Sequence, residues 1–227
     1  SEALAKWCSH EAATKLSWEI KTKRRTAEAH FTDAQAKFRQ TDLHKAQTAC
    51  ANALAVFPAH AEALGLAKKV KAATAEAQAH LNVAQTHFDT QEFLMALEAL
   101  SKTLTMYATL NSALDLRFRA HELHADVLKS KADYTQAVNH YKKAIEVLPD
   151  TYNARNECNS RCHNSQGECL MELGQFVEAV AAFKKACSLD DISRCRLNLS
   201  NASLACLFQE YPQGQAVSGE AFGTKVS

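Results

Sequence analysis

The sequence has few of the residues that interrupt helices or replace them with strands. Only six glycines and three prolines occur in 227 residues, and aromatic side chains make up 7% of the chain. No stretch alternates apolar and polar residues with the period of two that is typical of a half-buried strand. Glycine and proline are the residues that cost most inside a helix, so their scarcity favours long helices. Together with the abundant alanine, this composition predicts an all-α chain.

The chain also lacks long apolar runs and an excess of charge of either sign. No segment approaches the roughly 20 consecutive apolar residues that span a bilayer, and no basic-then-apolar leader opens the sequence. The 26 basic and 25 acidic residues give a formal net charge of +1, which argues against a nucleic-acid partner. We expect an intracellular, cytoplasmic protein without membrane insertion.

Sequence motifs for catalysis, cofactors and metals are missing as well. There is no glycine-rich phosphate loop, dinucleotide fingerprint or GxSxG motif, and the carboxylates are scattered. The eight cysteines are expected to be reduced and to pack as small apolar residues. Cys158, Cys162 and Cys169 would lie along about 16 Å of one helix, too far apart for tetrahedral zinc. We predict no enzymatic activity, no cofactor and no metal.

A repeat becomes visible through four histidines. Each is followed 16 residues later by an alanine, the frame alanine of its unit: His30 and Ala46, His80 and Ala96, His121 and Ala137, His163 and Ala179. Apolar or small residues three before, four after and seven after each frame alanine share one helix face. A polar turn precedes the alanine, and a further amphipathic stretch precedes the turn. Each unit is therefore predicted to be a helix, a tight turn and a second helix.

This pattern resembles the tetratricopeptide repeat, a 34-residue helix-turn-helix family. The resemblance is closest over 160–193, which carries Gly167, Leu170, Gly174, Phe176, Ala179, Phe183 and Ala186. It implies a right-handed α-solenoid of helix-turn-helix repeats with some extended first helices and terminal capping helices. In the two N-terminal units the first-helix apolar residues run one position later than the family expects, which predicts turns one residue shorter there.

The predicted organisation is a row of four repeat units between two caps. The units cover 27–60, 77–110, 118–151 and 160–193, with an N-terminal capping helix or helices over 1–26, a C-terminal capping helix over 194–208 and a flexible tail over 209–227. The frame alanines are 50, 41 and 42 residues apart, so helical extensions are expected between units. The longest, 61–76, would lengthen the following first helix into an exposed ridge. In the C-terminal cap, the apolar residues Leu197, Leu204, Leu207 and Phe208 are the candidates for its packing face.

The resemblance implies a scaffold or adaptor that binds a peptide or helix of a partner protein in a concave groove lined by first helices. The candidate groove residues are Gln35, Gln85, Asp126, Lys129, Arg161 and Glu168. The ridge and the tail are further candidate contacts.

Two alternative functions remain at this stage. One is a co-chaperone that reads acidic chaperone tails, although Glu122 and Asp126 stand where such family members carry a basic and amide clamp. The other is RNA binding, against which the near-zero charge argues. A separate hypothesis concerns the repeated histidines: if they are partly buried and neutral, acid would charge them and loosen the array.

Overall fold

The computed structural model describes residues 2–149, 155–190 and 193–210. Over these ranges the chain forms nine α-helices and no strand, which confirms the predicted all-α fold: α1 (Glu2–Arg39), α2 (Leu43–Val56), α3 (Ala61–Asp89), α4 (Phe93–Met106), α5 (Asn111–Ser130), α6 (Tyr134–Val147), α7 (Arg155–Glu172), α8 (Phe176–Leu189) and α9 (Ser193–Glu210). None of the described helices combines the length and hydropathy that crossing a bilayer requires. Residues 211–227 of the predicted tail lie outside the described residues.

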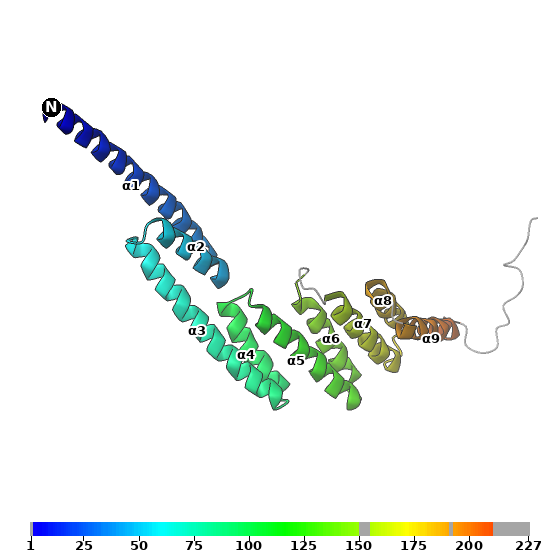
Figure 1. Cartoon of the computed structure of the whole chain (residues 1–227). Helices are drawn as coiled ribbons and strands as arrows, with labels where there is room; N and C mark the ends of the chain where they lie inside the picture. Colours follow the sequence, from blue (N-terminus) through cyan, green and yellow to red (C-terminus); the bar gives the residue numbers. More distant parts are fainter. Residues whose placement is uncertain (1, 150–154, 191–192, 211–227) are drawn as a thin grey trace, which may run out of the picture. The chain divides into compact units, whose positions relative to one another are not determined.

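The helices are divided between two compact units, Ser1–Leu116 and Arg117–Ser227, here called unit 1 and unit 2. In unit 1, α1 packs on α2, α2 on α3 and α3 on α4 (Figure 1). In unit 2, α6 packs on α7, α7 on α8 and α8 on α9. Each unit is thus a stack of helices joined by short turns, as helical repeats are.

Small residues lie where the helices meet. All four frame alanines are completely buried. Twelve residues before them, in the first helix of each repeat, stand Ala34, Ala84, Ala125 and Gly167, and these are buried as well. A Cβ atom built on Gly167 would lie 2.6 Å from Cε1 of Phe183, closer than real Cβ contacts. The position therefore has to be glycine for α7 and α8 to pack as they do.

The four turns between first and second helices share one backbone conformation. The residue five positions before each frame alanine has a positive φ: 56° at Thr41, 61° at Gln91, 60° at Ala132 and 71° at Gly174. The next residue's amide donates to the carbonyl five residues earlier in all four turns, for example Asp42 to Lys37 at 3.0 Å and Glu92 to His87 at 2.8 Å. The turns are equally long, so the expectation of shorter turns in the first two repeats, 27–60 and 77–110, was wrong. The same hydrogen bonds close every turn, which fixes its length.

Both ends of the chain differ from the predicted caps. Residues 10–26 continue α1 with every side chain exposed, because no proline or glycine interrupts the helix and α2 is only 14 residues long. The segment 61–76 lies inside the unbroken helix α3. It is not the exposed ridge that was expected, because Ala63 and Val70 are buried against residues of α2 and only the other side of the segment is exposed. In α9 the buried residues are Cys195 and Ala202, whose small side chains, seven residues apart, allow a close approach to the preceding helices. The expected packing face points away from them instead, with 52–72% exposure at Leu197, Leu204, Leu207 and Phe208.

The left-handed turn residue predicts a stabilising substitution. Gln91→Gly removes the steric cost of a positive φ and should raise the free energy of unfolding by about 1 kcal/mol. Thr90→Gly is the matched control, because φ at Thr90 is −86° and no strain is relieved there. Glycine at this position adds freedom to the unfolded chain and removes the hydroxyl's bonds to Thr86 and His87, so it should lower the free energy of unfolding. Urea unfolding of both variants checks this. Equal shifts of the two midpoints in the same direction would contradict it.

The two glycines inside helices should respond in opposite ways to alanine. Gly167→Ala forces a methyl group into Phe183 and should lower the free energy of unfolding by about 1–3 kcal/mol. Nothing lies within 4 Å of a Cβ at Gly65, so Gly65→Ala should raise it by about 0.5–1 kcal/mol through helix propensity. Chemical denaturation measures both. A neutral Gly167→Ala variant would show that the close contact is not required.

Candidate partner-binding surface

Two ion pairs join α5 to α7 in unit 2. Arg161 on α7 reaches Glu122 on α5 with two hydrogen bonds, Nε to Oε1 at 2.5 Å and Nη2 to Oε2 at 3.0 Å. Lys129 on α5 donates from Nζ to Glu168 on α7. Glu122 and Glu168 are 12% and 23% exposed, so both carboxylates are shielded although Arg161 is 51% exposed. The two pairs tie consecutive first helices together along one face.

Further polar contacts extend this face across the unit. The hydroxyl of Tyr141, on α6, donates to Oδ1 of Asp126. Asn164 donates to Oε1 of Glu168 at 2.9 Å, and Asn198 on α9 donates to the same oxygen at 3.2 Å. These contacts connect α5, α7 and α9 through side chains that we call the polar row: Glu122, Asp126, Lys129, Arg161, Asn164, Glu168 and Asn198.

The candidate residues predicted from the sequence fall into two groups. Four of them, Asp126, Lys129, Arg161 and Glu168, belong to the polar row. Gln35 on α1 is half-buried and Gln85 on α3 is exposed, and both lie in unit 1. The amide of Gln85 donates to Asp89 of its own helix at 2.7 Å. The six residues are therefore split between the units.

Sequence reasoning missed the partners that complete the polar row. Tyr141, Asn164 and Asn198 were not considered, and Glu122 was considered only as a carboxylate that would repel an acidic tail. A usable signal existed for the ion pairs: both join residues 39 positions apart, three fewer than the 42 residues between the frame alanines Ala137 and Ala179. A search for oppositely charged residues separated by the repeat spacing minus about one helical turn would have identified both pairs.

The electrostatics of the polar row favour binding over chemistry. The bond to Glu122 raises the pKa of Arg161, and burial, with the bond to Asp126, raises that of Tyr141. Burial also raises the pKa of the Cys169 thiol to about 11, so this sulfur is a poor nucleophile at neutral pH. The row holds paired charges and amide groups, which can position a peptide by hydrogen bonds.

A cluster of three histidines lies between α5 and α6. His121 and His140 are 5% and 8% exposed, and their Nδ1 atoms are 3.2 Å apart. The ring of His124 lies edge-on to that of His140, with centroids 4.5 Å apart. Burial, then the positive potential of neighbouring histidine, arginine and lysine side chains, lowers the pKa of His121 to about 3 and that of His140 to about 4. The cluster is therefore neutral at physiological pH.

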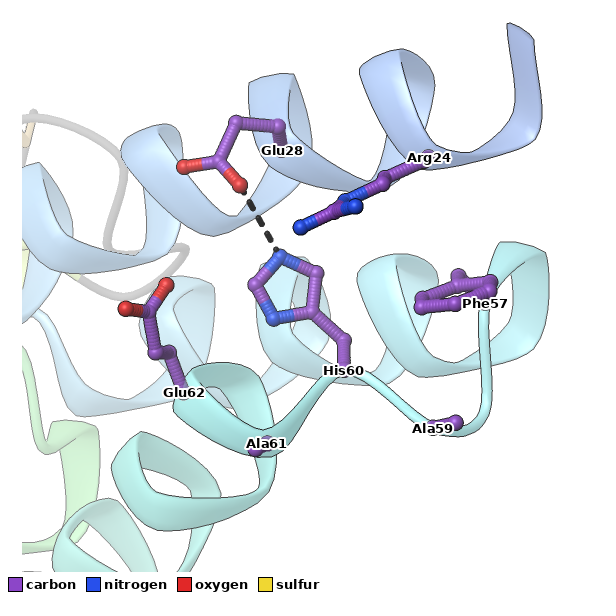
Figure 2. Close-up of a pocket in the computed structure, with 7 residues that line it drawn as sticks. All are labelled: Arg24, Glu28, Phe57, Ala59, His60, Ala61 and Glu62. Atoms are coloured by element: carbon purple, nitrogen blue, oxygen red, sulfur yellow. Dashed lines mark hydrogen bonds and ion pairs between the residues drawn. The ribbon is translucent and has the colours of Figure 1, made fainter. Parts of the chain in front are cut away.

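One group among the described residues has the composition of a metal site, namely Glu28, His60 and Glu62 in unit 1 (Figure 2). His60 is the N-cap of α3, and its Nδ1 accepts the amide hydrogen of Ala63 at 3.3 Å. Its Nε2 is then the protonated nitrogen and donates to Glu28 at 3.2 Å. A metal at Nε2 would move the proton to Nδ1, against the amide of Ala63, whereas metal-bound histidines normally donate from the second nitrogen. The residues do not fit a metal, and His60 instead joins α1 to α3.

Comparison with known proteins places the repeats in a family context. The sequence model of the tetratricopeptide repeat matches residues 116–191. DnaJ homolog subfamily C member 7 from Mus musculus is 33% identical over 85 residues, and its Homo sapiens counterpart is equally similar. The match covers 34% of this chain and 16% of each relative's length.

Two solved structures also resemble the chain. The P58(IPK) TPR domain aligns with a TM-score of 0.50 at 19% identity, covering 91% of this chain and 54% of that one. The N-terminal domain of stress-induced protein-1 from C. elegans aligns with a TM-score of 0.41 at 14% identity, covering 58% of this chain and 98% of that one. At such identities, the P58(IPK) alignment concerns the fold alone.

The buried histidines predict acid destabilisation of unit 2. Because the pKa values of His121 and His140 in the folded state lie below the ordinary 6.5, their contribution to stability is complete above about pH 6.5. It is lost as the pH falls toward 4, where protonation favours the unfolded chain. His140→Gln should flatten this dependence, whereas the exposed His44→Gln should not. Urea unfolding between pH 7.5 and 4 measures it, and equal slopes for the two variants would contradict the role of the cluster.

Proposed function

The chain carries tetratricopeptide repeats, and we propose that it is a non-enzymatic scaffold or adaptor whose polar row binds a segment of a partner protein within a larger assembly. Helical repeats of this family are protein-interaction modules that use the extended surface formed by successive repeats. The observation that carries the proposal is the continuity of the polar row across α5, α7 and α9.

The pairing inside the polar row indicates what kind of segment it binds. Its carboxylates and its cations already contact each other, so a strongly charged peptide would have to break these pairs to gain new ones. A polar, nearly neutral segment can add hydrogen bonds to the rim of the pairs without that loss. The proposed ligand is therefore an uncharged polar peptide, extended or helical.

Neutral substitutions of one ion pair test this function. Charge reversal at Glu168 would remove the acceptor of Lys129 and of Asn164. Glu122→Gln with Arg161→Gln is preferable, because both substitutions remove the charge and keep a side-chain amide that can form hydrogen bonds. Lys142→Gln with Glu146→Gln on the exposed face of α6 removes the same charges elsewhere. We expect proteins captured from native lysate by the full chain to be lost about tenfold with the first pair and retained with the control.

Thermal melting of both double variants verifies that they are folded. Little change in melting temperature is expected, because partly exposed ion pairs contribute only about 1 kcal/mol or less to the free energy of unfolding. Retention of every partner by the Glu122 and Arg161 variant would remove the polar row as the binding surface. Equal loss with both double variants would show a nonspecific charge effect.

A second candidate function is a chaperone-associated module, which the similarity to DnaJ homolog subfamily C member 7 favours. In this proposal the chain contacts a chaperone itself. Asp126 would repel an acidic tail, and Glu122 and Arg161 already bind each other, so contact should survive removal of that tail. Binding of the full chain to purified cytosolic chaperones with and without their tails shows whether the chain contacts the acidic tail or the rest of the chaperone.

A further inference from the structure

Helix α1 extends well beyond the helix that pairs with it. It has 38 residues, whereas α2 has 14, and Figure 1 shows its N-terminal half projecting past α2. The side chains of residues 10–26 are all exposed, and burial begins at Ala27. The projecting part includes the large apolar residues Leu16 and Ile20, with exposed fractions of 58% and 49%.

The projecting part continues the face that α1 already buries. Residues at helical spacings of three, four and seven lie on one face, and this face runs from the exposed part into the covered part as Ala13, Leu16, Ile20, Ala27, Phe31 and Ala34. The last three are between 0% and 7% exposed and pack in unit 1. The first three therefore form an unoccupied continuation of an existing helix interface.

Two cations stand on this same face at the point where cover begins. Lys23 and Arg24 follow Ile20 by three and four residues, and both are exposed. Arg24 also borders a cavity of about 290 Å³ at the end of α2, which is lined by Phe57 and His60 and by the carboxylates of Glu28 and Glu62 as well. Figure 2 shows the Arg24 side chain extending along this cavity toward His60. The face thus combines an aliphatic stripe with positive charge and ends in a recess.

We propose that this face, called the α1 extension face and formed by Ala13, Leu16, Ile20, Lys23 and Arg24, docks an amphipathic, acidic α-helix of a partner protein. The docked helix lies along α1 beyond the end of α2 and packs aliphatic side chains on Leu16 and Ile20, as α2 does farther along. Its carboxylates meet Lys23 and Arg24 and lie short of the cavity beside Phe57, where Glu28 and Glu62 would repel them. This surface belongs to unit 1 and is separate from the polar row of unit 2.

The test uses the full chain and two labelled synthetic 18-residue helices that share one leucine and alanine stripe. One probe carries glutamates beside the stripe and the other carries lysines. Fluorescence anisotropy at about 0.15 M salt should show binding of the acidic probe and at least tenfold weaker binding of the basic one. Lys23→Glu with Arg24→Glu should weaken the acidic probe at least tenfold, and Leu16→Asp with Ile20→Asp should abolish its binding.

The matched control is Lys68→Glu with Lys69→Glu, which changes net charge equally at exposed positions of α3 and should leave binding unchanged. Circular dichroism verifies that each variant is folded. The proposal is overturned if the acidic probe does not bind, or if it binds the two charge-reversed variants equally. Loss of binding in the Glu122→Gln, Arg161→Gln variant would assign the probe to the polar row, also against the proposal. A dimer in sedimentation velocity that Leu16→Asp with Ile20→Asp dissolves would assign the face to a second copy instead.

Discussion

Close approach of helices at residues without bulk is the constraint on which the rest of the structure depends. Each frame alanine is fully buried, and the partner position in the first helix is alanine or glycine in all four repeats. A larger side chain at these positions would separate the two helices of a pair, as the 2.6 Å distance from a Cβ at Gly167 to Phe183 shows. Helices packed this closely fill the interior with few voids. In unit 2 the large residues Tyr141, Phe118 and Phe183 are buried in the same cluster as these alanines.

Once the pairs are fixed, the turns and the polar row follow from their spacing. The identical turn geometry sets how each second helix begins, with Asp42 and Asp133 accepting amide hydrogens as N-caps at 3.2 Å. Repetition then brings neighbouring first helices side by side, so that residues offset by about one helical turn from equivalent positions meet, as Glu122 and Arg161 do. These ion pairs add little stability by themselves, but they neutralise the surface that a ligand would contact. The proposed preference for an uncharged peptide thus depends on the packing between repeats.

The two units present different surfaces for interaction. Unit 2 holds the polar row, with its charges satisfied internally, and the neutral histidine cluster between α5 and α6. Unit 1 has the longest helices of the described chain. Past the end of α2, α1 carries an apolar face flanked by two exposed cations, Lys23 and Arg24. The two proposed binding surfaces, one for hydrogen bonding and one for helix docking, are therefore formed by different residues. This is the arrangement expected of an adaptor.

The amino-acid sequence by itself determined the helices and their pairing. Glycine and proline scarcity, the frame alanines and the turn residues are local signals, and local signals fix helices and tight turns. Contacts between first helices could not be read the same way, because Glu122 and Arg161 meet only when the repeats are stacked. The outward rotation of Leu197 and Phe208 on α9 had the same origin: hydropathy favoured that face, whereas the fit of Cys195 and Ala202 against the preceding helices decided the packing. His140 likewise joined His121 only in the tertiary structure, because side-chain neighbours from different helices depend on how those helices are placed.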